Sequence, residues 1–409
     1  MYIKKISIKH VKSIDNLTIE FDTPYKGWHV LLGDNGAGKS SILKMISLCF
    51  LGDKQGYALQ QNFKSWITKG KEKATCEMDL IFDSKQDFLS EVYEGIKFYI
   101  SISKEGELKF ELKGADKELS LVDITSGWYS AAFGPFRRIG TQETKSVDFL
   151  HINLSNHITL FDPTYNLTEA VQWLKDLKFE ELSTKKNNSF DTIVSFINNT
   201  ELLPNNVKIE KVNHEGVFFV DGTNKDISIN ELSDGYQSVF SLTLEILRQI
   251  SRRFKLKEVI KEKEYFSCIT ATGVILIDEV DVHLHPQWQA KIGEWFKRYF
   301  PNIQFIVSTH SPIICQSADP GSIWKIEHSK TDKPSKRITG QAYKRMVYGS
   351  ITDAIGTDNF GEERIERSDK SKEMLERLAL LNMKSIRGLA TKEEEKERKD
   401  LKSILPSED

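Results

Sequence analysis

The chain has 409 residues, of which 39% are hydrophobic and 28% are charged, and its formal net charge is −2. This length and composition predict about two to three folded domains and exclude a globally disordered chain. A net charge close to zero also excludes a broadly basic protein, so any surface for nucleic acid would have to be a local patch.

The cysteines are scattered along the chain, and none belongs to a C-x-x-C pair; they are Cys49, Cys76, Cys268 and Cys315. This spacing argues against a zinc site and against a disulfide framework. The N-terminus alternates apolar and polar residues and does not have the pattern of a signal peptide. The sequence contains no apolar run of membrane-spanning length. We therefore expect a reduced, cytoplasmic protein with no membrane partner.

Short runs of alternating apolar and polar residues near the N-terminus predict β-strands. A hairpin is expected from Tyr2–Ile8 and Leu17–Phe21. An antiparallel patch is expected further along, with strands at Ala74–Phe82, Ile96–Ser103 and Leu108–Leu112.

Between the hairpin and this patch, the sequence GDNGAGKSS fits the pattern G-x-x-x-x-G-K-[ST]. It lies between an apolar strand at Trp28–Leu32 and a helix at Ser41–Phe50, which is the context that a phosphate loop requires. Glycines let backbone N–H groups approach a phosphate, and the helix directs its positive end toward the same anion. Lys39 would reach the β- and γ-phosphates, and the Ser40 hydroxyl would ligate Mg²⁺. The candidate nucleotide-binding residues here are Gly33, Asp34, Asn35, Gly36, Ala37, Gly38, Lys39, Ser40 and Ser41.

The middle of the chain is expected to be mixed helix and strand. A Gly- and Pro-interrupted stretch at Ala131–Gly140 precedes two predicted helices, Leu167–Leu182 and Asp191–Asn198. A hairpin is predicted from Val207–Val212 and Gly216–Asp221.

The sequence ELSDGYQS, residues 231–238, precedes an apolar helix at Val239–Ile250. A serine hydroxyl, a glycine N–H and a helix N-terminus can together form an anion site, so Ser233 and Gly235 are candidate nucleotide contacts. An ordinary N-cap by Ser233 or Asp234 is the alternative, and the two interpretations are compatible.

Two further candidate sites follow apolar runs that are typical of fully buried strands. Gly273–Ile277 is followed by Asp278, which can hold Mg²⁺, and by Glu279, which can polarise an attacking water as general base. After a helix at Gln287–Tyr299 and the next strand at Ile303–Ser308, His310 is placed to hydrogen-bond a γ-phosphate oxygen.

A last strand is predicted at Ile323–Glu327. Residues 329–367 are expected to form a linker or loop region, followed by a helical tail at 368–409 with helices Ser368–Gly388 and Thr391–Leu405. The sparse apolar stripes of these helices would pack on the chain's own domain or dock on a partner protein.

Several other features have more than one interpretation. His283 and His285 could bind a metal but are more typical of packed or hydrogen-bonded side chains. The basic run at Arg248–Lys263 could follow a nucleic-acid backbone, although a solvated helix face is favoured. Arg137 and Arg138 could contact phosphate or neutralise carboxylates.

The order of these motifs resembles that of ABC-type ATPases, and the sequences GDNGAGKSS and DEVDVHLHPQWQ are similar to the SMC/RecF/OLD-like branch. The resemblance implies an α/β head with a mostly parallel central sheet, an antiparallel β patch (about 74–115), a helical insertion (about 165–205) and a helical tail. The ATPase domain would be residues 1–328, and its cofactors would be ATP and Mg²⁺. Lys39, Ser40, Asp278, Glu279 and His310 would act within one chain. Ser233 and Gly235 would contact the ATP of a partner head.

Within that branch, AAFGPFRR, DVHLHPQW and the charged tail resemble stand-alone ATPases of anti-phage defence systems such as Septu and some retrons. The resemblance implies a homodimer of heads or a higher homo-oligomer, with a separately encoded nuclease or toxin as partner and nucleic acid as an open question. A DNA-repair or DNA-binding ATPase of the SMC/RecF type and an ATP clamp with negligible turnover are the alternatives.

The sequence departs from the family pattern in two respects. Asp234 and Tyr236 interrupt the family's L-S-G-G-Q motif, and a carboxylate close to a γ-phosphate would be unfavourable, so slow hydrolysis is expected. The family's metal-binding glutamine is assigned to Gln142, with Gln60 or Gln61 as less favoured choices.

Overall fold

The computed structural model describes residues 1–82, 95–114, 127–137, 152–184, 189–203, 207–220, 226–263, 266–328, 331, 333–349 and 369–404. The chain divides into two compact units, residues 1–355 and 356–409.

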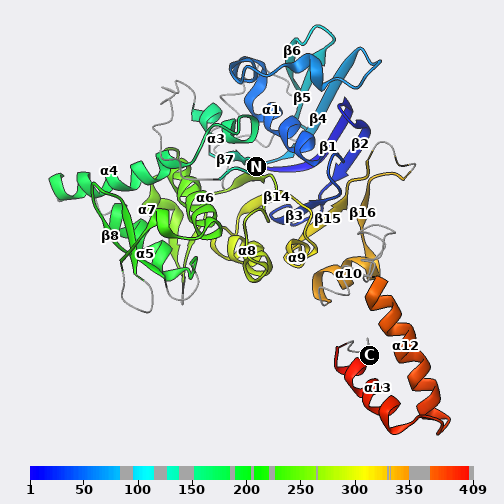
Figure 1. The fold of residues 1–409 in the computed structure, drawn as a ribbon. Helices are drawn as coiled ribbons and strands as arrows, with labels where there is room; N and C mark the ends of the chain where they lie inside the picture. The colour runs from blue at the N-terminus through cyan, green and yellow to red at the C-terminus, as the bar shows by residue number, and fades with distance from the viewer. Residues whose placement is uncertain are drawn as a thin grey trace. The chain divides into compact units, whose positions relative to one another are not determined.

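The central sheet of the first unit has six strands in the order β16–β15–β3–β14–β13–β7 (Figure 1). Five of them are mutually parallel, and β16 is antiparallel to β15. Their bounds are β3 (Gly27–Leu32), β7 (Tyr129–Phe133), β13 (Gly273–Ile277), β14 (Ile303–Thr309), β15 (Gly321–Lys325) and β16 (Lys336–Ile338). Every residue of β3, β7, β13 and β14 is buried, which explains why these strands are apolar without alternation.

A second sheet of five antiparallel strands has the order β2–β1–β4–β5–β6. Its strands are β1 (Tyr2–Val11), β2 (Ile14–Glu20), β4 (Lys73–Ile81), β5 (Lys97–Ser103) and β6 (Leu108–Lys113). Helix α1 (Lys39–Ala58) contacts strands of both sheets and shares one apolar core with them. The predicted hairpin and antiparallel patch are therefore confirmed, and the hairpin joins the patch in one sheet.

Helices α4 (Thr168–Thr184) and α5 (Ser189–Asn199) lie in the range predicted for the insertion. A three-stranded sheet follows, made of β8 (Lys208–Val212), β9 (Val217–Val220) and β10 (Asp226–Ser228). It confirms the predicted hairpin and adds a strand. The remaining elements are α3 (Ile152–Phe161), the 3₁₀ helices η1 (Phe63–Trp66) and η2 (Ile229–Glu231), α6 (Asp234–Ser251), α7 (Leu256–Val259), β11 (Ile260–Glu262), β12 (Ser267–Ile269), α8 (Pro286–Tyr299), α9 (Pro312–Cys315) and α10 (Gly340–Tyr348).

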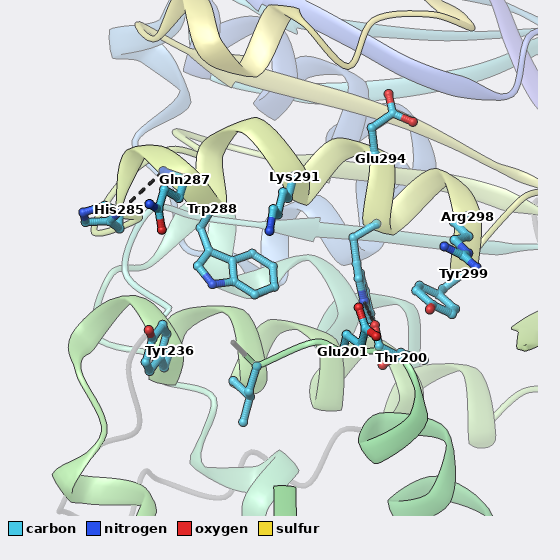
Figure 2. A pocket seen from close by; sticks show the side chains of 12 residues that line it. Thr200, Glu201, Tyr236, His285, Gln287, Trp288, Lys291, Glu294, Arg298 and Tyr299 are labelled. Carbon is cyan, nitrogen blue, oxygen red and sulfur yellow. Dashed lines mark hydrogen bonds between the residues drawn. The ribbon is translucent and has the colours of Figure 1, made fainter. Parts of the chain in front are cut away.

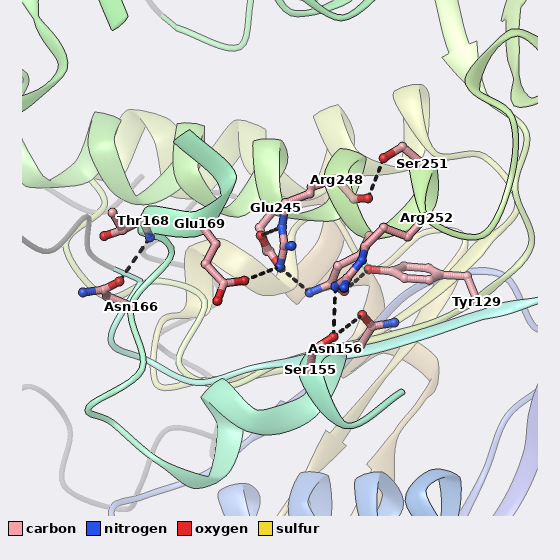
Figure 3. Close-up of polar contacts among 11 residues, drawn as sticks. Tyr129, Ser155, Asn156, Asn166, Thr168, Glu169, Glu245, Arg248, Ser251 and Arg252 are labelled. Carbon is pink, nitrogen blue, oxygen red and sulfur yellow. Dashed lines mark hydrogen bonds and ion pairs between the residues drawn. The ribbon is translucent and has the colours of Figure 1, made fainter. Parts of the chain in front are cut away.

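Helix α6 is tied to the central sheet and to α4 by a buried polar network (Figure 3). The Tyr129 hydroxyl on β7 donates to Gln249 Oε1 at 2.6 Å, and Gln249 Nε2 donates to Glu245 Oε1 at 2.7 Å. Arg248 donates to both carboxylate oxygens of Glu245 at 2.7 and 2.8 Å and pairs with Glu169 on α4 at 3.1 Å. Since such a network is stable only when its members are satisfied together, it fixes α6 relative to β7.

One strand was not predicted, and one expectation needs correction. Residues 131–133 belong to strand β7 at the edge of the central sheet, because their side chains are buried against β13. The predicted linker, 329–367, contains strand β16 and helix α10. Both carry buried apolar residues, among them Ile338 and Met346, but too few to mark these elements in the sequence.

The described part of the C-terminal unit, residues 369–404, contains the helices α12 (Asp369–Ile386) and α13 (Lys392–Ile404), in the range predicted for the helical tail. Leu378, Leu381 and Leu401 form its small apolar core. None of the helices within the described ranges is long and apolar enough to cross a membrane.

His157 on α3 joins the phosphate-loop helix to the edge strand. Its Nδ1 and the Ser47 Oγ on α1 are 2.8 Å apart, and its Nε2 and the Ser130 Oγ on β7 are 3.0 Å apart. The ring is fully buried, and this burial lowers the pKa of His157 to about 3. The imidazole is therefore neutral in the folded protein at neutral pH.

We predict that His157 makes the protein acid-sensitive. The pKa of a histidine in the unfolded chain is about 6.5. Below that pH, the unfolded chain binds a proton that the folded chain excludes. The free energy of unfolding should therefore fall on acidification, by up to about 1.4 kcal/mol per pH unit from this group. In denaturant titrations at about pH 7 and about pH 5, His157→Gln should lose less stability than the wild type. The exposed His214 provides the control, His214→Gln, and equal losses in all three proteins would contradict the prediction.

Candidate functional site

The loop between β3 and α1 has the backbone that a phosphate loop requires. Gly36 and Gly38 have φ angles of 80° and 105°, which glycine adopts without strain. A Cβ on Gly33 would lie 2.3 Å from the carbonyl oxygen of Ile326, so that position also requires glycine. Because the first N–H groups of a helix have no acceptor within it, the start of α1 offers donors to an anion.

Lys39 directs its ammonium into this loop. Its Nζ donates to the carbonyl oxygens of Gly33 at 2.7 Å and Asp34 at 3.0 Å, and it lies 3.0 Å from His310 Nε2. A lysine ammonium can only donate, so His310 Nε2 is the acceptor nitrogen. Burial lowers the pKa of Lys39, and the nearby carboxylates of Asp278 and Glu279 act in the opposite direction. The structure thus joins two predicted site residues that are far apart in the sequence.

Asp278 and Glu279 follow β13 at the same edge of the sheet. Asp278 is 4% exposed, and the Ser308 hydroxyl donates to its Oδ1 at 2.5 Å. The same hydroxyl accepts the backbone N–H of Glu279 at 2.8 Å. Ser308 was not predicted as a site residue. The sequence feature that could have identified it is its position on the neighbouring parallel strand, two residues before His310.

The donor set around Asp278 fits a magnesium ion. Hydroxyl and carboxylate oxygens are the ligands that Mg²⁺ accepts, and Ser40 and Asp278 supply one of each. In the described part of the chain, the Ser40 hydroxyl makes no hydrogen bond, and only one carboxylate oxygen of Asp278 accepts one. The residues present therefore match the predicted chemistry.

The segment that follows Asp278 has an unusual backbone. Glu279 and His283 have φ angles of 46° and 65°, a region that non-glycine residues rarely adopt. Asp281 Oδ1 accepts a hydrogen bond from the Thr309 hydroxyl at 2.5 Å, which ties this segment to the end of β14. Strained positions of this kind persist only where the surroundings hold them.

Arg137 is one of the groups that hold this segment. Its guanidinium is buried and donates to the carbonyl oxygens of Gly134 at 2.9 Å, Asp278 at 2.8 Å and Glu279 at 3.0 Å. Its Nε donates to the Ser238 hydroxyl on α6 at 3.4 Å. The two roles considered from sequence were phosphate contact and neutralisation of carboxylates. The hydrogen bonds of Arg137 instead go to main-chain carbonyls and to the Ser238 hydroxyl.

Ser233 is the N-cap residue of α6, but its side chain makes no capping hydrogen bond and is exposed. Within the described ranges, neither Ser233 nor Gly235 hydrogen-bonds to the phosphate loop of its own chain. A Cβ on Gly235 would lie 2.6 Å from the carbonyl oxygen of His283. The start of α6 therefore packs closely on the segment after β13 and leaves the serine hydroxyl accessible.

Comparisons with known proteins agree with this geometry. A family model described as "AAA domain, putative AbiEii toxin, Type IV TA system" matches residues 136–316, and one described as "Protein of unknown function (DUF2813)" matches residues 1–96. The "Septu protein PtuA" of Bacillus mycoides (strain KBAB4) is 28% identical over 79% of this chain and 40% of its own length. The "Retron Vc95 probable ATPase" of Vibrio cholerae serotype O1 biovar El Tor is 26% identical over 76% of this chain and 71% of its own length.

The chain is similar to ATPases of anti-phage defence systems. Among solved structures, an SMC head bound to the C-winged helix domain of ScpA aligns with a TM-score of 0.51 at 17% identity. The alignment covers 83% of this chain and 97% of that one, and it confirms the ABC-type head fold. The chain spans less than half the length of the Bacillus mycoides relative.

The remaining candidate residues from the sequence fall into three groups. Arg138 and Gln142 lie outside the described residues. His285 Nδ1 accepts the N–H of Gln287 at 3.4 Å and so caps α8, and no cluster of three potential metal ligands occurs among the residues described. Part of the basic run is engaged in internal contacts, since Arg252 donates to Ser155 at 3.3 Å.

A pocket of about 650 Å³ lies beside α8, and it was not predicted from the sequence. Figure 2 shows Trp288 and Lys291 of α8 facing Tyr236 at the start of α6. Thr200, Glu201 and Leu203 are among the other residues that line the pocket. The pocket is therefore adjacent to the N-terminus of α6.

We predict that the close approach at Gly235 is essential. In Gly235→Ala the new methyl group must displace α6 or the His283 backbone, so melting temperature and ATP turnover should both fall. Gly216→Ala is the matched control, because nothing lies within 4 Å of a Cβ at that position. Differential scanning fluorimetry and phosphate release would measure both effects. Wild-type behaviour of Gly235→Ala would contradict the packing described.

Proposed function

We propose that this chain is an ATP-binding and hydrolysing molecular switch. Two heads would close around two ATP·Mg²⁺, and hydrolysis would release them. The observation that carries the proposal is the contact between Lys39 and His310 in a phosphate loop beside Asp278. It supports a single site assembled from three neighbouring strand ends, which is the place where ligands bind in open α/β sheets.

In this proposal each residue has a defined task. Lys39 and the N–H groups of α1 would bind the phosphates, and Ser40 and Asp278 would hold Mg²⁺, which supplies positive charge for phosphoryl transfer. Glu279 would polarise the attacking water, and His310 would hydrogen-bond the γ-phosphate. Gln142 remains the proposed metal-binding glutamine.

The second half of each site would come from a partner head. Ser233 is exposed with a hydroxyl that does not cap its own helix, which supports a contact outside the chain. Gly235 would bring its N–H to the same phosphate. The assembly would be a homodimer of heads or a higher homo-oligomer.

The proposed role is control of a separately encoded nuclease or toxin in anti-phage defence. The similarity to the Septu and retron proteins supports this role. Nucleic acid is a further candidate partner. A second candidate is an ATP clamp with negligible turnover, because the exposed Asp234 would place a carboxylate next to the γ-phosphate contact of Ser233.

We predict that Glu279→Gln lowers steady-state phosphate release by roughly 100-fold or more, since loss of a general base typically costs 10²–10⁴-fold. Binding of ATP should be retained, because the amide removes the base and leaves the phosphate loop intact. Phosphate release and equilibrium binding of labelled ATP would separate the two effects. Unchanged turnover would contradict the assignment of Glu279.

We predict that two inactive variants complement each other. Lys39→Ala and Ser233→Arg should each abolish turnover alone. Their equimolar mixture should recover up to about a quarter of the wild-type rate, since about half of the dimers are mixed and each has one complete site. The absence of recovery, with both variants folded and able to associate, would show that the site is not shared between chains.

A further inference from the structure

We propose that Arg137 is a positioning residue for hydrolysis, which sets the backbone that carries Glu279 and links it to helix α6. This inference rests on the proposed ATPase function. Arg137 follows β7, the edge strand beside β13, and 3% of the residue is exposed.

Every N–H of the guanidinium has an acceptor in the structure, and none of these acceptors is a carboxylate. Nη1 donates to Gly134 O and Asp278 O at 2.9 and 2.8 Å. Nη2 donates to Glu279 O and Val280 O at 3.0 and 3.5 Å, and Nε donates to Ser238 Oγ at 3.4 Å. An arginine side chain has five N–H donors in a rigid fork, so its full capacity is used here.

Three of these acceptors are consecutive carbonyls, those of Asp278, Glu279 and Val280. Successive carbonyls of an extended strand point to opposite sides, so three can converge on one group only where the chain turns. The φ angle of 46° at Glu279 provides that turn. The guanidinium thus stabilises a backbone that a non-glycine residue would otherwise avoid.

The charge of Arg137 is suited to this task. Burial lowers its pKa to about 10, while Asp278, Asp281 and Glu279 act to raise it, so the side chain stays protonated at neutral pH. Hydrogen bonds from a charged donor are stronger than neutral ones, and carbonyl acceptors leave the carboxylates of Asp278 and Glu279 available for metal and water.

The same guanidinium contacts two parts of the proposed composite sites. Asp278 and Glu279 belong to the site of the chain's own ATP. Ser238 lies in the first turns of α6, which begins beside Ser233 and would reach the partner's ATP. Arg137 therefore joins the general base of one site to the helix that completes the other.

The test compares Arg137→Lys with the wild type. A lysine keeps the charge but has a single nitrogen, which cannot span three carbonyls and Ser238. We expect kcat to fall at least about tenfold, while the Kd for ATP changes less than about twofold, because the lost interaction acts on the chemical step and not on binding. Phosphate release and equilibrium binding of labelled ATP measure these two quantities.

The matched control is Arg248→Lys, which alters a partly buried arginine in an α6 network that the site does not use. It should lower the melting temperature and leave kcat within about twofold. A wild-type kcat in Arg137→Lys, or equal losses of kcat in both variants at matched folded fraction, would overturn the inference.

A second variant keeps the inference testable if Arg137→Lys folds poorly. Ser238→Ala removes only the link to α6, and we expect kcat to fall about fivefold with binding unchanged, as for the loss of one hydrogen bond.

Amide hydrogen exchange at residues 279–283 is a readout that needs no turnover, and it should be faster in Arg137→Lys. If the wild type hydrolyses no ATP, the proposed function fails and this exchange result alone decides the role of Arg137. Unchanged exchange would then overturn it.

Discussion

The site depends on the parallel register of the central sheet. Thr309 on β14 is paired with Leu32 on β3, and Val307 on β14 is paired with Ile277 on β13. Because these strands run in the same direction, the residues that follow them emerge at one edge. This register brings the phosphate loop, the carboxylates and His310 together across more than two hundred residues of sequence.

Buried cations and carboxylates lie together at this edge of the sheet. Lys39 and Arg137 are buried cations next to Asp278, and each is satisfied mainly by main-chain carbonyls rather than by ion pairs. Carbonyl oxygens compensate a buried cation without neutralising it, so positive charge remains available to phosphate oxygens. The carboxylates of Asp278 and Asp281, in turn, each accept a hydrogen bond from a hydroxyl group, and the second carboxylate oxygen of Asp278 remains able to bind a cation.

Much of the fold could be predicted from sequence because its signals are local. The phosphate loop, the buried runs before Asp278 and His310, and the hairpins each need only a few neighbouring residues. Strand β7 and helix α10 escaped prediction because tertiary burial, not a local pattern, defines them. Ser308 and the carbonyl contacts of Arg137 are side-chain arrangements between distant segments, and no spacing in the sequence encodes them.

The small core of the C-terminal unit has a thermodynamic consequence. Leu378, Leu381 and Leu401 bury little apolar surface compared with the large core of residues 1–355. A core of this size contributes little stability of its own, so we expect the described helices α12 and α13 to unfold before the larger unit does. Unfolding of the chain is then not a two-state process, and each unit has its own free energy of unfolding. The melting temperature of the larger unit is therefore the one that reports on substitutions near the site.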